Sequence, residues 1–117
     1  MSEIKRHGTS QRWADVVIHR GVAHWVEIAE DTSLDLRGQT EQVLAQIDST
    51  LRMIQSDRTR LLQVLIYLHD LNDAAILNEL WDAWVPTGHP PVRAMVEVGL
   101  AKPLKVEMVV TAATCEP

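Results

Sequence analysis

The spacing of apolar side chains along the chain predicts two amphipathic helices. From residue 35 to residue 54 apolar side chains recur every three or four positions, and the opposite face carries arginine, glutamine, glutamate and aspartate. A second helix is predicted from about Ala74 to Val85, because Asn72 and Asp73 can cap its start and a proline and a glycine follow its end. The residues expected to face the core are Leu36, Thr40, Val43, Leu44, Ile47, Leu51 and Ile54 in the first helix, and Ile76, Leu77, Leu80, Trp81 and Trp84 in the second.

Runs of apolar and β-branched residues predict six strands. Two short runs within Ala14–Val26 flank a turn and indicate a hairpin. Leu61–Leu68 is apolar on both faces, which is typical of a strand in the middle of a sheet. Val92–Val98 and Lys105–Thr111 alternate and are joined by the segment GLAKPL, and a further strand is expected at Ile4–Gly8. The predicted order is three strands, a helix, a strand, a helix and two strands.

This order indicates an α+β fold in one domain spanning residues 1–117. Two helices can cover only one face of a mixed six-stranded sheet. The strands carry too many apolar residues for the second face to lie in water. We therefore expect the chain to associate with copies of itself through that open face.

One arginine stands out among these strands. Val92–Val98 has an all-apolar side and a second side that carries Arg93, Met95 and Glu97. We expect the apolar side to meet the helices and Arg93 to point into the open face, with Glu107 opposite it across a predicted hairpin. A buried arginine without a partner costs several kcal/mol, so its presence indicates an anion from the protein or from a ligand.

The identity of that anion is left open by the residues alone. Arg93 can hold a small carboxylate ligand in a pocket between subunits, since ligand sites favour such junctions. It can equally form a structural ion pair with Glu97 on its own strand or with Glu107 on the next strand.

Charge and composition exclude several classes of protein. The chain has 16 acidic and 11 basic residues and a formal net charge of -5, so it lacks the basic surface that nucleic acids require. The single cysteine, Cys115, excludes an internal disulfide and suits a reducing compartment. No apolar stretch approaches the ~18 residues of a membrane span, and the first residues lack the apolar segment of a signal peptide. We expect a cytoplasmic protein without membrane or nucleic-acid partners.

Metal and cofactor chemistry is not expected. The five histidines are scattered, without the spacing that would place two ligands on one metal ion. No glycine-rich phosphate loop, nucleotide fingerprint or Ser/His/Asp order is present. The sequence therefore predicts neither a metal site nor a cofactor.

Several segments together resemble the RidA/YjgF family of reactive-intermediate deaminases. The resemblance rests on PVRAMVEV, GLAKPL and KVEM, and RWADVVIH, QTEQVLAQID and NDAAILNELWDAWVPTGHPPVR look especially similar to its YoaB-type branch. It covers nearly the whole chain. It implies a chorismate-mutase-like fold assembled as a homotrimer, with clefts at the subunit interfaces.

The resemblance also implies an activity and a site. Family members with deaminase activity hydrolyse 2-imino acids to 2-keto acids and ammonia without a cofactor. By position, Arg93 would hold the substrate carboxylate, Glu107 would orient or deprotonate the attacking water, and Met95 and Trp13 would complete the pocket. The chain departs from the archetypal pattern at a serine, where Val26 or Glu27 stands, and at a cysteine, where Met95 stands. The alternative is therefore a trimer of the same family that binds small carboxylates without turning them over, or with another specificity.

Overall fold

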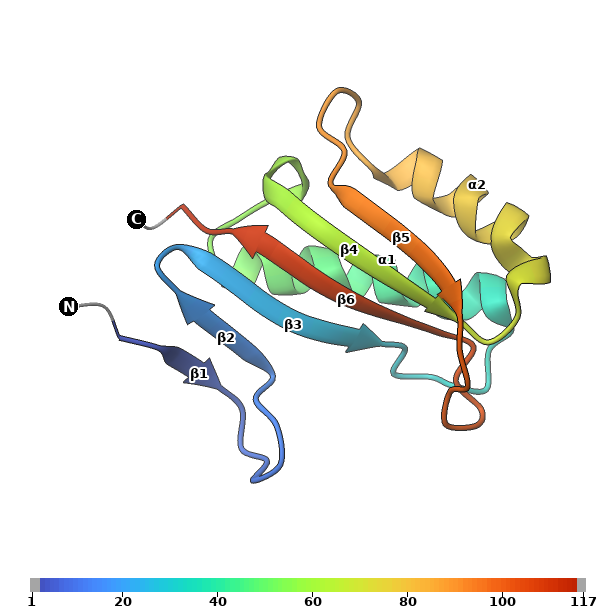
Figure 1. Cartoon of the computed structure of the whole chain (residues 1–117), viewed down its shortest axis with the longest axis horizontal. Coiled ribbons are helices and arrows are strands. Elements are labelled where there is room, and N and C mark those ends of the chain that lie inside the picture. Colours follow the sequence, from blue (N-terminus) through green and yellow to red (C-terminus); the bar gives the residue numbers. More distant parts are fainter. Residues whose placement is uncertain (1–2, 116–117) are drawn as a thin grey trace.

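The computed structural model describes residues 3–115 and contains one mixed sheet and two α-helices (Figure 1). The helices are α1 (Leu36–Met53) and α2 (Ala74–Trp84), and short 3₁₀ helices at Arg58–Arg60 and Leu71–Asp73 precede β4 and α2. The strands are β1 (Lys5–His7), β2 (Val16–His19), β3 (Val22–Ile28), β4 (Leu61–Leu68), β5 (Val92–Glu97) and β6 (Val106–Ala113). The predicted elements and their order are thus confirmed.

The strands lie in the order β1-β2-β3-β6-β4-β5, with only β4 and β5 parallel. Helix α1 lies behind the centre of the sheet, and α2 packs beside α1 near the β5 edge (Figure 1). The core between helices and sheet includes Ile47, Ile66 and Met108, all fully buried. As predicted, both helices cover one face and leave the other open.

The helix starts are fixed by aspartates. Asp35 accepts a hydrogen bond from the Gly38 amide of α1 at 2.8 Å. The predicted caps of α2 are wrong in detail, because Asp73 makes no side-chain cap bond. Asp70 instead accepts from the Asn72 amide, which starts the 3₁₀ turn that leads into the helix.

The predicted hairpin between β5 and β6 is wrong. Strand β4 lies between them, so β5 pairs only with β4 among the residues described, and in parallel. The reason is the crossover through α2, which returns the chain to the start of β4 and adds β5 at the outer edge. The loop from residue 98 to residue 105 then carries the chain past β4 to the middle of the sheet.

The predicted orientation of β5 is also wrong. Arg93 lies beside Val64 and Met95 beside Ile66, and both β4 residues are fully buried on the helical side. Arg93 and Met95 therefore face the helices, while Val92 and Val96 lie on the open face with 66% and 42% of their surface exposed. Alternation correctly grouped these side chains, but it could not show that a long polar side chain fits on the helical side at the sheet edge.

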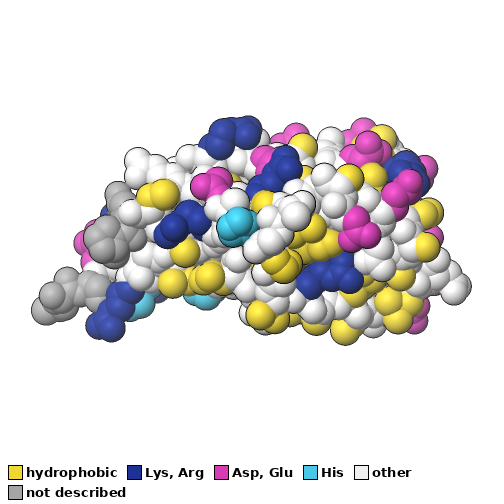
Figure 2. All heavy atoms as spheres, turned by 90° about the horizontal axis from the view of Figure 1, so that it is seen from above, with side chains coloured by type: hydrophobic (Ala, Val, Ile, Leu, Met, Phe, Trp, Pro, Cys, Tyr) yellow, Lys and Arg dark blue, Asp and Glu magenta, His cyan; other side chains and the backbone are white. Residues whose placement is uncertain are grey.

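The open face is apolar, as expected from the sequence. Its exposed large side chains include Val26, Ile28 and Leu62 besides the two valines of β5. In Figure 2, hydrophobic side chains line the lower side of the molecule and most acidic ones lie on the upper, helical side. No helix within residues 3–115 is long and apolar enough to cross a membrane.

A fully buried glutamine joins the loops at one end of the sheet to α1. The Gln39 amide donates to the carbonyls of Thr32, Leu34 and Pro103 at 3.0–3.1 Å, and its oxygen accepts from the Lys105 amide at 2.9 Å. Four backbone groups are thereby satisfied by one side chain. The loop between β5 and β6 is held to the start of α1 in this way.

Gln39→Leu should lower the free energy of unfolding by about 3 kcal/mol or more, because it fills the site but leaves buried backbone groups without partners. Chemical denaturation would measure the change. Gln42→Leu is the control, since within the described part of the chain Gln42 makes a single side-chain hydrogen bond, to the Asp31 amide. Equal losses for both variants would contradict this account.

Candidate functional site

A groove of about 690 Å³ opens beside β3 where β2 stops pairing with it. The pairing of β2 with β3 ends at Val17 and His24, so within residues 3–115 the last residues of β3 pair with no strand on that side. The segment before β2 turns away there and leaves the groove between itself, β3 and α1. Its lining residues are Trp13, Ala14, Asp15, Val16, Trp25, Val26, Glu27, Ile28, Glu30, Gln46, Thr50, Met53 and Glu107.

A backbone hydrogen bond closes the loop that carries Trp13 and forms one wall of the groove. The Asp15 amide donates to the His7 carbonyl at 2.7 Å, which ties the loop between β1 and β2 into a ring. Gly8 has a φ of +120°, and a Cβ there would lie 2.9 Å from the Asp15 nitrogen, so a larger residue does not fit. Trp13 projects from this loop with 64% of its surface exposed. The exposed indole is available to a ligand or to another chain.

Glu27 lies in the groove wall on the helical side and is fully engaged. One carboxylate oxygen accepts from the Trp25 indole at 3.0 Å and from the Thr50 hydroxyl at 3.1 Å, and the other accepts from the Gln46 amide at 3.1 Å. Gln46 and Thr50 lie four residues apart on one face of α1, which is how both reach Glu27. Glu27 is therefore a structural carboxylate that joins β3 to α1.

Glu107 enters the groove from the open face of the sheet. It lies on β6 between Ile28 of β3 and Tyr67 of β4. Within residues 3–115 its carboxylate has no hydrogen-bond or ion-pair partner. Glu107 and Trp13 thus line the same groove.

Arg93 lies elsewhere, against α2. Its Nη1 donates to the Asn78 side-chain oxygen at 2.8 Å, and its guanidinium carbon lies 5.4 Å from the centre of the Trp81 ring. Both predicted ion pairs are wrong: Glu97 accepts from the Leu71 amide, and Glu107 lies on the opposite face of the sheet with β4 between. Across residues 3–115, Arg93 has no carboxylate partner.

One chain therefore holds two separated halves of the predicted site. Trp13 and Glu107 share the groove, whereas Arg93 and Met95 lie on the helical side at the far edge of the sheet, with Met95 packed against the core. Among the described residues, the groove is lined by four carboxylates and by no lysine or arginine. A site that uses both Arg93 and Glu107 requires two copies of the chain.

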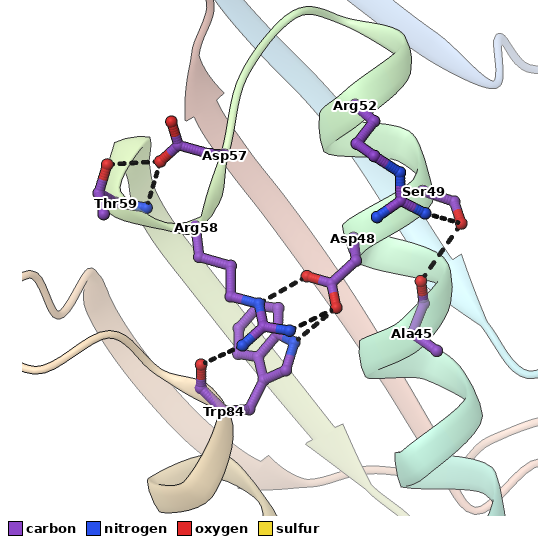
Figure 3. A network of polar contacts seen from close by, with 8 residues as sticks. All are labelled: Ala45, Asp48, Ser49, Arg52, Asp57, Arg58, Thr59 and Trp84. Carbon is purple, nitrogen blue, oxygen red and sulfur yellow. Dashed lines mark hydrogen bonds and ion pairs between the residues drawn. The ribbon is translucent and has the colours of Figure 1, made fainter.

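The position of α2 is fixed by a second arginine. Arg58 lies between Asp48 of α1 and Trp84 at the end of α2 (Figure 3). It donates to both Asp48 oxygens at 2.7 and 2.8 Å and to the Trp84 carbonyl at 3.0 Å. The bond to Asp48 raises the pKa of Arg58 above its usual value, so this charge is permanent.

The described residues contain no group of three or more histidine, cysteine, aspartate or glutamate side chains that could hold a metal ion.

Comparison with known proteins places this α+β domain in a family. Residues 9–114 match the family described as Endoribonuclease L-PSP. The RutC family protein YoaB of Escherichia coli is 42% identical over 111 residues, which cover 94% of this chain and 97% of that protein. A RutC family protein of Haemophilus influenzae is 39% identical over 115 residues, covering 96% and 98%. The chain belongs to this family, the RidA/YjgF family.

Solved structures show the same fold. An uncharacterized protein from Pseudomonas aeruginosa has a TM-score of 0.91 at 38% identity, covering 96% of this chain and 99% of that one. NMB1025 from Neisseria meningitidis, a member of the YjgF protein family, has a TM-score of 0.90 at 37% identity, covering 98% of both chains. The chain thus has the same fold as a solved member of the YjgF family.

Replacing Glu27 should destabilise the chain more than replacing an exposed glutamate nearby. Glu27→Leu removes the acceptor of three side-chain donors and should cost about 2 kcal/mol of unfolding free energy. Glu30→Leu is the matched control, because the Glu30 side chain is exposed. Both values come from urea titration, and a loss of less than about 0.5 kcal/mol for Glu27→Leu would contradict the structural role.

Proposed function

We propose that the protein hydrolyses small 2-imino acids to 2-keto acids and ammonia at clefts between subunits of a homotrimer with a chorismate-mutase-like fold. The observation that carries this proposal is that Arg93 and Glu107 lie on opposite faces of one sheet and that neither forms an ion pair within residues 3–115. Arg93 can bind a carboxylate, and Glu107 can accept a proton from water. Family membership supports the proposal.

The exposed surface supports self-association. Val26, Ile28, Leu62, Val92 and Val96 leave a large apolar area on the open face, which a single soluble chain rarely exposes. When copies pack through this face, Glu107 comes to lie near an interface, and the β5 edge of a neighbouring copy can bring Arg93 to the groove. We propose a cytoplasmic location for this assembly and a small carboxylate as its ligand.

The reaction needs an anchor, a base and water. Arg93 of one copy would bind the substrate carboxylate through paired N–H groups, each charge-assisted bond contributing about 1.5–3 kcal/mol. Glu107 of another copy would take a proton from water as its oxygen adds to the imine carbon. Glu107 would return this proton to the nitrogen, which gives a carbinolamine. Transfer of the carbinolamine hydroxyl proton to the amino group then allows the carbon–nitrogen bond to break, so that ammonia leaves and the keto acid remains. The imine carbon is electrophilic enough to react with water without a covalent bond to the protein.

The surroundings of the reacting atoms come from two further residues. Trp13 would form an apolar wall beside the substrate, since its indole lines the groove and is exposed. Backbone groups at Met95 would lie near the substrate, because β5 is an edge strand and the Met95 side chain is turned toward the core. The net charge of -5 argues against RNA as the substrate.

A second candidate function is carboxylate binding without turnover. It is favoured by Glu27, which occupies the region where archetypal members carry a serine and whose carboxylate is already engaged by three donors. A polar contact to the substrate is then missing from that wall. Binding of 2-ketobutyrate without any acceleration of imine hydrolysis would support this candidate over the enzyme.

Arg93→Ala should strongly reduce the acceleration of imine hydrolysis. An amino-acid oxidase would generate the imino acid, and keto-acid release would be followed with and without the protein. Loss of the anchor should lower kcat/KM by roughly tenfold to several hundredfold, and Arg93→Lys should restore little of it because lysine lacks the planar fork. Equal rates with and without the wild-type protein would remove the deaminase function for the imines tested.

Mixing two inactive variants should restore activity. Arg93→Ala retains Glu107, and Glu107→Gln retains Arg93, so a hybrid trimer contains clefts in which both groups are intact. Random reassembly after unfolding and refolding together should give about a quarter of the wild-type activity. Separately refolded variants mixed afterwards serve as the control. No recovery from co-refolded, verified hybrids would show that both groups do not act in a cleft shared by two copies.

A further inference from the structure

Two tryptophans of α2 lie between two arginines that come from other elements. The Trp81 and Trp84 rings are 5.5 Å apart and inclined at 47°. Arg58 lies over Trp84 at 5.1 Å, and Arg93 lies over Trp81 at 5.4 Å. Each arginine therefore packs on the face of an indole ring, and the two indole rings contact each other.

The hydrogen-bond partners of the two arginines differ in charge. Arg58 is held by both oxygens of the Asp48 carboxylate, so its charge is compensated within the chain. Arg93 is held by the neutral side-chain amide of Asn78 at 2.8 Å. Among residues 3–115 no carboxylate forms an ion pair with Arg93. The chain thus orients Arg93 without neutralising it.

Nearby acids do not compensate Arg93. Glu79, next to Asn78 on α2, pairs with Arg37 of α1 at 2.5 Å, and Glu97 on β5 accepts from the Leu71 amide at 2.9 Å. The acid beside Asn78 and the acid on the Arg93 strand are both held by other partners. The positive charge of Arg93 remains available to an anion from outside the chain.

We infer that Asn78 and Trp81 are positioning residues that fix the Arg93 guanidinium and keep its charge free for a carboxylate ligand. This inference rests on the proposed function, in which Arg93 is the carboxylate anchor. Asn78 and Trp81 lie three residues apart and so share one face of α2. The amide oxygen occupies one of the five guanidinium N–H donors, and the ring face occupies none. Enough donors remain for the paired bonds that a carboxylate makes.

The neutrality of Asn78 is the critical property. An aspartate of the same size would accept the same hydrogen bond, but it would also pair its charge with Arg93 and compete with the ligand. Asn78→Asp should therefore leave the fold intact, or stabilise it, while it weakens anion binding. A merely structural role for Asn78 predicts the opposite, namely unchanged binding.

Calorimetric titration of the full chain with 2-ketobutyrate tests this inference. Asn78→Asp should weaken binding at least about tenfold, with a thermal unfolding midpoint equal to or above that of the wild type. In the imine assay it should raise KM with little change in kcat, because anchoring contributes equally to substrate and transition state. Asn72→Asp is the matched control: it adds the same charge six residues earlier and should leave the affinity within about twofold.

The variants separate failure of this inference from failure of the proposed function. Loss of binding in Arg93→Ala with full binding in Asn78→Asp would overturn the role of Asn78 and leave the anchor in place. Equal losses in Asn78→Asp and Asn72→Asp would also overturn it, since the effect would then be one of overall charge. Wild-type binding in Arg93→Ala would overturn both the anchor and the residues that position it.

Discussion

The parallel pairing of β5 with β4 is the constraint on which the arrangement of the functional groups depends. Parallel neighbours require a crossover, and here the crossover is α2. Because α2 returns over the helical side, it lies next to the strand that it delivers. Arg93 consequently meets an amide and an indole of that helix. The same crossover leaves β4 between β5 and β6 and so separates Arg93 from Glu107.

Local pattern was sufficient for the elements and insufficient for their pairing. The stripe of α1, the hairpin of β2 and β3 and the limits of β4 follow from periodicity and turn residues, which act over a few positions. The hairpin predicted for β5 and β6 failed because a short connecting segment is compatible with both a hairpin and a passage across one strand. The choice between them depends on tertiary packing, which alternation does not encode.

The candidate site was likewise predicted only in part: its residues could be identified from the sequence, but their arrangement could not. Sequence pattern and family resemblance singled out Arg93, Glu107, Met95 and Trp13, and the structure places Glu107 and Trp13 in one groove. The face of Arg93 could not be predicted, because alternation defines which residues share a side and not which side meets the helices. The partners of Arg93 and Glu27 were missed for a related reason. Asn78, Gln46 and Thr50 are ordinary helix-surface residues until the packing of the helices is known.

In the proposed assembly, the division of the site between copies would link ligand binding to association of the chains. A carboxylate that contacts Arg93 of one chain and the groove of another binds only the associated state. By thermodynamic linkage it must then tighten association by the same factor by which association tightens its binding. Substrate concentration and protein concentration would then be coupled variables: dilution would lower the number of clefts as well as the amount of protein, and abundant substrate would restore them. In the proposed assembly, the opposed faces of Arg93 and Glu107 would thus make the occupied cleft part of what holds the copies together.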